Sequence, residues 1–119
     1  MAAETAETEH HNEVRLVGRV AAEALERELP SGDVLVQLRL VVRRRAHRGT
    51  PPRQPIDTLD CVAWLAAPRR SLLSLDPGDT VEITGELRRR FWGGASGSSR
   101  YEVEVHKAKR LARASQLSA

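Results

Sequence analysis

The chain has 119 residues, enough for one domain, and 40% of them are hydrophobic, which allows a real core. The sequence contains no apolar run that could cross a membrane and no secretory signal in its acidic N-terminus. Its single cysteine, Cys61, excludes an internal disulfide framework and fits a reducing cytoplasm.

Charge is distributed unevenly along the sequence. The net charge is +3, but residues 1–13 contain four glutamates and no lysine or arginine. Without these four of the 16 acidic residues, the chain holds 19 basic against 12 acidic side chains, a net charge of +7. A basic body favours a polyanionic partner, with nucleic acid first and an anionic membrane surface second. Genomic bias toward arginine is the alternative explanation of the same charge.

Residues 1–11 form an acidic leader without hydrophobic periodicity, and we expect this leader to be disordered. A strand is expected from Asn12 on, because mostly polar residues alternate with apolar residues and glycine between Val14 and Val20. Gly18 inside this strand indicates a bend or a close approach of another backbone.

Residues 21–29 are compatible with a short helix or with a continued, coiled strand. The Pro-Ser-Gly-Asp turn at residues 30–33 favours the strand, because such a turn forms a hairpin with the segment that follows. That segment, residues 34–43, has the clearest apolar alternation in the chain. It leads into a basic loop, residues 44–53, which glycine and proline interrupt.

A third strand is expected over residues 56–65, followed by a helix over residues 66–75 with Pro68 in its first turn. A fourth strand is expected over residues 80–90 and a last strand over residues 100–108, joined by a glycine- and serine-rich loop. The side chains expected to face inward from these three strands are Leu59, Cys61, Ala63, Leu65, Val81, Ile83, Gly85, Leu87, Tyr101, Val103 and Val105.

This order of elements predicts an all-β fold over residues 12–111, followed by a short disordered tail at residues 112–119. Five strands with a short helix between the third and the fourth are the layout of a five-stranded Greek-key barrel. Gly18 and Gly85 suit the sharp coiling that such a small barrel needs.

The side chains that alternate with the inward sets must point outward. Both tryptophans fall in this outward set, together with several arginines. Indole rings beside guanidinium groups suit unpaired bases, because the ring stacks on a base while arginine binds the phosphate. Duplex DNA hides its base faces, so the pattern favours single-stranded DNA, with RNA as a close variant. The candidate nucleic-acid-binding residues are Trp64, Trp92, Arg39, Arg43, Arg44, Arg45, Arg48, Arg88 and Arg90.

These side chains also have structural explanations. A tryptophan at a strand end commonly covers a barrel mouth or lies in a subunit interface, and for Trp64 taken alone we prefer that explanation. Trp92 opens the glycine-rich loop among basic and aromatic neighbours, which favours binding. The arginine run at residues 43–45 is by itself more often a solvated loop, although its place at a strand end favours a binding role.

No catalytic constellation is visible. The four histidines have no cysteines or carboxylates at zinc-like spacing, and Cys61 falls on the inward side, as an inert core thiol would. The glycine-rich loop lacks the lysine and the helix of a phosphate-binding motif. We therefore expect a protein that is not an enzyme and that binds no metal, cofactor or small-molecule substrate.

Four segments of the chain resemble the bacterial single-stranded DNA-binding protein family. Residues 12–20 resemble the first strand of that family, residues 38–40 the core of its second strand, and residues 60–64 its third strand, which an aromatic residue closes. The most specific segment is residues 77–92, which resembles the family pattern Gly-x-x-Val-x-Val-x-Gly-x-Leu followed by basic residues and tryptophan. The ordered set covers about Asn12 to Leu111.

The resemblance implies an OB-fold that assembles as a homotetramer and wraps single-stranded DNA in replication, repair and recombination, in the cytoplasm and at the nucleoid. It also implies base stacking on Trp64 and Trp92. The sequence departs from the family at Ala46 and Thr58, where aromatic residues are usual, and at Asp60, where a basic residue is usual. Each lost stacking partner is worth about 1–3 kcal/mol. The chain also departs from the family at its end, which lacks the acidic tip, so the sequence does not indicate which protein partners it recruits.

Two functions are therefore weighed. The first is non-enzymatic, largely sequence-independent binding of single-stranded DNA by a homo-oligomer, a tetramer or a dimer, whose edge strands pair with a neighbour. The alternative is a primosome-like adaptor or interaction module, whose tryptophans contact protein and which binds nucleic acid weakly. The missing aromatic residues and Asp60 favour the alternative.

Overall fold

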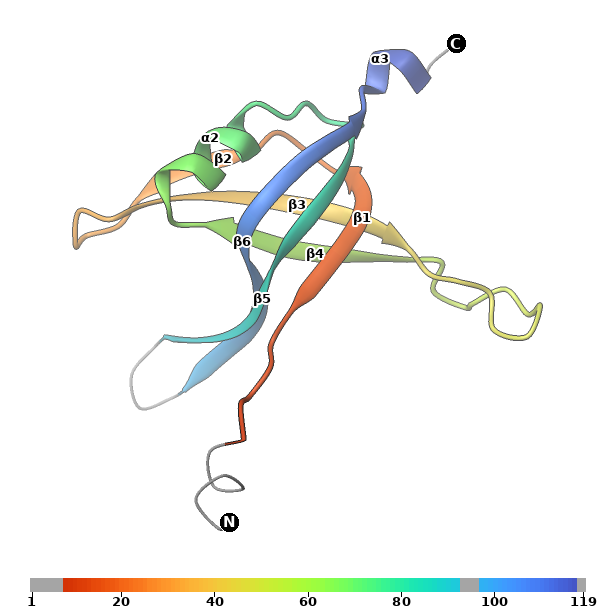
Figure 1. Cartoon of the computed structure of the whole chain (residues 1–119), viewed down its shortest axis with the longest axis horizontal. Coiled ribbons are helices and arrows are strands. Elements are labelled where there is room, and N and C mark those ends of the chain that lie inside the picture. Colours follow the sequence, from red (N-terminus) through yellow and green to blue (C-terminus); the bar gives the residue numbers. More distant parts are fainter. Residues whose placement is uncertain (1–7, 93–96, 118–119) are drawn as a thin grey trace.

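The computed structural model describes residues 8–92 and 97–117, apart from the side chains of residues 92, 116 and 117. Its elements follow the expected order, with one additional short strand and a final helical turn (Figure 1). They are β1 (Val14–Val20), β2 (Leu25–Glu28), β3 (Val34–Arg43), β4 (Ile56–Ala63), α2 (Ala66–Leu73), β5 (Thr80–Trp92), β6 (Ser98–Ala112) and α3 (Ala114–Leu117).

The strands form one curved sheet in the order β1-β5-β6-β4-β3-β2, and β1 also pairs with β3 to close the ring. All pairings are antiparallel except the one between β4 and β6, which is parallel and short. The prediction of an all-β barrel is confirmed, and so is the helix between the third and fourth predicted strands, which are β4 and β5 of the structure. The extra strand β2 continues β1 after a bend and pairs with β3, so the strand interpretation of residues 21–29 is also confirmed.

The core is built from the side chains that the alternation places inward. Leu40, Ile83 and Val81 are fully buried, and Leu72 of α2 packs against the same cluster. Cys61 is also fully buried, as predicted. Thirteen buried side chains of the described residues form this cluster, and the strands must coil sharply to close around so small a core.

Two glycines permit that coiling. A Cβ atom at Gly18 would collide with the backbone carbonyl oxygen of Val41, and one at Gly85 with the backbone carbonyl oxygen of Glu104. Gly85 also lies at a shift in the register between β5 and β6. The close approach of another backbone, one of the two explanations predicted for Gly18, is confirmed, and Gly85 shows the same feature.

Three side chains that were expected to face inward are instead exposed: Leu65 (65% exposed), Leu87 (45%) and Tyr101 (59%). Leu65 follows the end of β4 and precedes α2, so the alternation of the strand no longer applies to it. Tyr101 lies where β5 and β6 extend as a hairpin past the barrel, and Leu87 lies at the rim of the barrel, opposite the buried Val103. Conversely, the outward-facing Val62 and Glu102 are buried.

The carboxylate of Asp79 ties the end of β6 to the start of β5. This buried side chain accepts hydrogen bonds from the backbone N–H groups of Asp76 and Ala114 and from Arg110 Nε, each at 2.9 Å. These bonds, led by the one from the Asp76 N–H, lower the pKa of Asp79 to about 2.

The two ends of the chain were both expected to be disordered. Of the acidic leader, residues 8–11 are exposed and residues 1–7 lie outside the described part of the chain. The tail begins with the last residue of β6 and the single turn α3, and residues 118–119 are not described. Neither helix in the described part combines the length and the apolar character that spanning a membrane requires.

Candidate nucleic-acid interface

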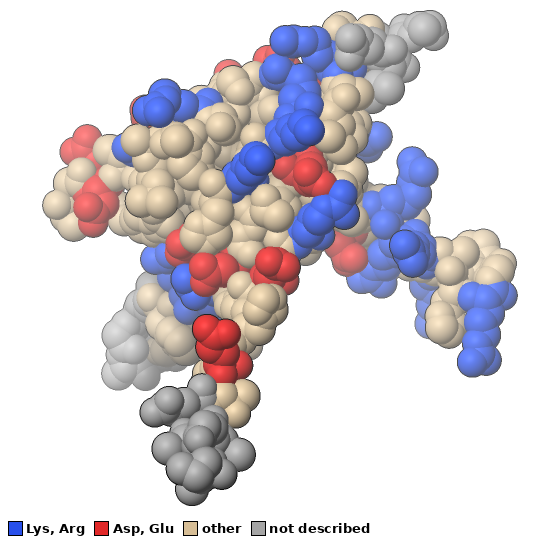
Figure 2. All heavy atoms as spheres, viewed as in Figure 1, with Lys and Arg blue, Asp and Glu red and all other residues tan. Residues whose placement is uncertain are grey.

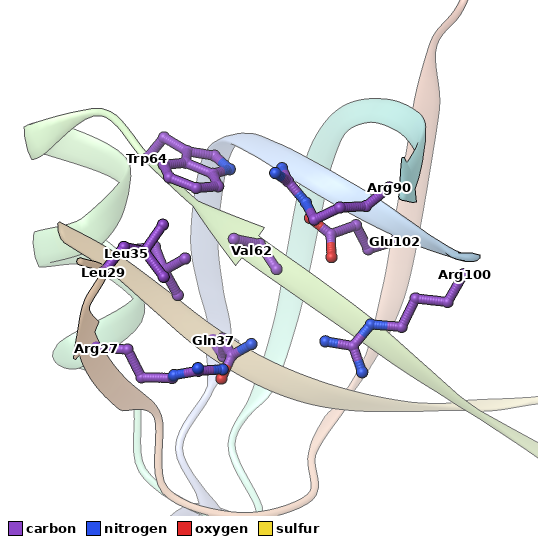
Figure 3. Close-up of a pocket in the computed structure, with 9 residues that line it drawn as sticks. All are labelled: Arg27, Leu29, Leu35, Gln37, Val62, Trp64, Arg90, Arg100 and Glu102. Carbon is purple, nitrogen blue, oxygen red and sulfur yellow. The ribbon is translucent and has the colours of Figure 1, made fainter. Parts of the chain in front are cut away.

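Two adjoining grooves run over the outer face of β2, β3 and β4. One has a volume of about 400 Å³ and lies beside Trp64, and the other, of about 440 Å³, lies beside Asp60. Both are lined by Arg27, Gln37, Val62 and Arg100, so they adjoin, and we call the two together the outer groove. Figure 3 shows the part beside Trp64.

At one end of the outer groove, the half-buried Trp64 already carries a cation. The Arg90 guanidinium carbon lies 4.7 Å from the centroid of the indole ring, and Figure 3 shows Arg90 directed at that ring. Arg90 Nε donates a hydrogen bond of 2.9 Å to the buried carboxylate of Glu102. One face of the indole is therefore stacked on a guanidinium group that an ion pair holds in place.

The middle of the outer groove combines an apolar floor with charged sides. Leu35 and Val62 are buried and form the floor. Arg27 of β2 and Arg100 of β6 lie on opposite sides, with both guanidinium groups directed inward and the Gln37 amide between them (Figure 3). Flat apolar surface beside guanidinium groups can accept the faces of bases together with the phosphates that link them.

The far end of the outer groove contains an opposed pair of charges. Arg39 is well exposed, and its Nε lies 3.5 Å from the Asp60 carboxylate, which belongs to the neighbouring strand. Asp60 thus occupies the groove as the sequence indicated, and it neutralises part of the charge that Arg39 offers. An exposed pair of this kind is weak, because water screens it.

The residues predicted to bind nucleic acid lie in two regions, the outer groove and the β3–β4 hairpin, and the side chain of one of them, Trp92, is not described. Trp64, Arg39 and Arg90 line the outer groove. Arg88 is on the groove side of the same strand as Arg90, but it pairs with Glu86 at 2.8 Å and Glu104 at 3.3 Å, and these carboxylates raise its pKa. The side chain of Trp92 lies outside the described residues.

The arginines of the β3–β4 hairpin lie apart from the outer groove. Figure 2 shows Lys and Arg side chains gathered on this projecting hairpin. Arg43, Arg45 and Arg48 are exposed there. Arg44 instead donates to both carboxylate oxygens of Asp57, at 2.7 and 3.0 Å, which raises the pKa of Arg44 and lowers that of Asp57. Arg44 thus fixes the base of the hairpin.

Arg27, Gln37 and Arg100 were not among the candidates predicted from the sequence. Gln37 shares the outward parity of Arg39, and Arg100 that of Glu102, so the alternation contained the signal. Arg27 lies in the segment whose strand character the alternation did not settle. Which outward residues meet depends on the bend between β1 and β2 and on the curvature of the hairpin, and neither is visible in a periodic pattern.

Cys61 and the histidine and acidic side chains are the groups of the described residues that bear on catalysis or metal binding. Burial raises the pKa of the Cys61 thiol to about 12, so this cysteine is not a nucleophile. Within residues 8–92 and 97–117, no three histidine, cysteine or acidic side chains gather closely enough to hold a metal ion.

Comparison with known proteins agrees with this geometry. The sequence profile of the Single-strand binding protein family matches residues 11–111. The single-stranded DNA-binding protein of Treponema pallidum (strain Nichols) is 30% identical over 94 residues, which are 79% of this chain and 53% of that protein. The chain thus spans about half the length of this relative.

A solved structure shows the same fold. In the Plasmodium falciparum SSB complex with single-stranded DNA, the protein superposes with a TM-score of 0.69 at 21% sequence identity, covering 87% of this chain and 96% of that one. The fold is accordingly an OB-fold. With its sequence matched over nearly the whole barrel, the chain belongs to the single-strand binding protein family.

Proposed function

We propose that this chain binds single-stranded DNA without catalysis and that the outer groove is its binding site. The observation that carries the proposal is the outer groove itself, with an indole–guanidinium stack at one end, an apolar floor and arginines on both sides. The family match and the names of the two similar proteins support the same ligand.

In the proposed complex, bases stack and phosphates pair. A base stacks either on the free side of the Trp64 ring or on the outer side of the Arg90 guanidinium plane. Arg27, Arg39 and Arg100 bind phosphates along the strand. Because every base has a stacking face, binding is largely independent of sequence. RNA offers the same faces and phosphates, so we propose DNA on the ground of the related proteins.

The projecting β3–β4 hairpin extends the path of the strand. Arg43, Arg45 and Arg48 are exposed on it and bind phosphates in our proposal. Arg44 and Arg88 contribute less, because carboxylates already hold their guanidinium groups. Trp92 is proposed as a further stacking residue, on the sequence pattern alone.

Self-association is part of the proposal. Over Val14–Gly18, β1 pairs with β5 on one side and with no strand on its other side in the described part of the chain. An uncovered edge of this kind is a ready template for a strand of another copy. We propose a homo-oligomer, a dimer or a tetramer, formed through this edge.

The groove is tested with variants that remove one chemistry at a time. A fluorescently labelled oligo-dT is titrated with the wild type, with Trp64→Leu and with Arg100→Gln, followed by fluorescence anisotropy. Trp64→Leu removes a stacking ring and should weaken binding about 10-fold, since a stacked base is worth about 1–3 kcal/mol. Arg100→Gln should weaken binding and reduce its dependence on salt.

The matched control is Leu73→Ala, which truncates an exposed side chain of α2 away from the outer groove. This variant should bind as the wild type does. If both groove variants also bind like the wild type, while circular dichroism shows that all are folded, the outer groove is not the binding site.

A further inference from the structure

The β5–β6 hairpin has a second face that the proposed function does not use. Residues 87–92 pair with residues 98–103, and the ribbon that they form, which extends beyond the barrel, is called the arm (Figure 1). Side chains alternate between the two faces of such a ribbon. One face carries Arg90 and Glu102 toward the outer groove. The other, the distal face, carries the side chains of Leu87, Arg89, Phe91, Ser99 and Tyr101.

The distal face presents two exposed aromatic rings with a cation between them. Phe91 is 64% exposed and Tyr101 is 59% exposed. The Arg89 guanidinium carbon lies 4.9 Å from the centroid of the Phe91 ring and 5.6 Å from that of the Tyr101 ring. Arg89 also donates hydrogen bonds to Ser99 Oγ from Nε and Nη2, at 3.3 and 3.2 Å. The three flat groups are therefore held together.

The charge of Arg89 distinguishes this face from the groove side of the arm. There, Arg88 and Arg90 are each paired with glutamates. Arg89 has no carboxylate within ion-pair distance among the residues described, so its positive charge remains available to a ligand. A protein partner would have to bring its own carboxylate to an exposed and highly curved ribbon, whereas single-stranded nucleic acid brings a phosphate with every base.

The spacing of the rings also suits a polynucleotide. Phe91 pairs with Ser99 and Arg89 with Tyr101, so the two rings are diagonal neighbours across the ribbon. Diagonal neighbours lie about 7–8 Å apart at the backbone, a separation that long side chains bridge. Each ring keeps an outer face on which a base can stack.

We propose that the distal face of the arm is a second stacking platform for unpaired bases, with Phe91 and Tyr101 as the stacking rings and Arg89 as the phosphate ligand. The inference rests on the proposed function, and it adds a contact on the side of the arm that faces away from the outer groove. A strand bound in the groove would reach the platform by passing around the arm.

The test separates the flat rings from their apolar area. The double variant Phe91→Leu/Tyr101→Leu keeps apolar side chains but removes both planes, and it should weaken binding of a labelled oligo-dT of about 30 nucleotides by about 10-fold or more. The matched double variant Phe91→Tyr/Tyr101→Phe keeps both rings and should bind like the wild type. Phe91 and Tyr101 are both exposed, so the substitutions should be tolerated, and circular dichroism checks that each variant is folded.

Photo-crosslinking gives a second readout. An oligomer of the same length that carries 5-iododeoxyuridine should crosslink to Tyr101 or Phe91 of the wild type, as located by mass spectrometry. Sedimentation velocity measures the self-association of the wild type and of the two double variants, and we expect the same assembly for all three.

The outcomes are distinct. If the wild type binds oligo-dT and the leucine variant binds equally well, the platform is overturned and the outer groove stands. If the leucine variant loses self-association but keeps its affinity for DNA, the face is a protein contact and the inference is also overturned. If the folded wild type binds no oligo-dT, the proposed function fails, and the platform fails with it.

Discussion

At the scale of single residues, the most informative group is the stack of Trp64, Arg90 and Glu102. One face of the indole ring lies against the Arg90 guanidinium group, which the buried Glu102 carboxylate holds in place. Residues held in this way lose little conformational freedom when a ligand arrives. The stack therefore prepares one end of the outer groove for a base before any DNA is bound.

The same arrangement predicts a coupling between Arg90 and Glu102. Arg90→Gln leaves the Glu102 carboxylate buried without its cation and should lower the free energy of unfolding by about 1–2 kcal/mol, less than a fully buried pair because Arg90 is partly exposed. Glu102→Gln should cost less. The double variant should recover part of the loss, as measured by urea unfolding at neutral pH. Strictly additive losses would show that the pair does not act as a unit.

At the scale of elements, the alternation of side chains predicted which residues of β1, β3 and β5 enter the core, because the period of a strand is fixed by its backbone. The alternation failed where its environment changed. Leu87 and Tyr101 keep the inward parity but lie on the arm, at the rim of the barrel and beyond it. Phe91 was missed as a candidate for the same reason: parity predicts a side of the ribbon, while exposure depends on where the barrel ends.

The candidate site was predictable in part, because the sequence shows which side chains point outward but not which strands lie side by side. Trp64, Arg39 and Arg90 were found because each is outward on its own strand. Arg27 and Arg100 join them only through the pairing of β2 with β3 and the curvature of β6 beside β4. Ion pairs such as Arg44 with Asp57 also depend on register, so a basic run in the sequence overstated the charge that is free for a ligand.

The hydrogen bonds that the Asp79 carboxylate accepts, which we call the Asp79 clamp, join β6 and α3 to the start of β5. They predict a dependence of stability on pH. The folded-state pKa of Asp79, about 2, is below the ordinary value of 3.8. The clamp therefore stabilises the fold fully above about pH 4 and loses this contribution as the pH falls toward 2. Asp79→Asn should lower the urea midpoint at neutral pH, and the difference from the wild type should shrink between about pH 4 and pH 2. A difference that stays constant over this range would contradict the assignment.

At the scale of the whole molecule, the features of the chain agree on one kind of ligand. The barrel leaves a groove with stacking and cationic groups on its outer face, and a basic hairpin projects beside it (Figures 1 and 2). An acidic leader precedes this basic body. The small surplus of positive charge over the whole chain thus understates the charge at the places where a strand would lie.

Binding by such a surface must depend on salt. Neutralising phosphates with arginine releases counterions, and for single strands the slope of log affinity against log salt is about −0.7 per phosphate. If the outer groove contacts three or four phosphates, affinity should fall roughly 20- to 50-fold between about 50 and 200 mM salt.

The most direct measurement is a titration of a labelled oligo-dT with the wild-type protein at these two salt concentrations, beside a duplex of equal length. We predict clear binding of the single strand at the lower salt, a fall of the size given above at the higher salt, and weaker binding of the duplex throughout. Absence of binding by the folded protein at low salt, or equal affinity for the duplex, would contradict the account.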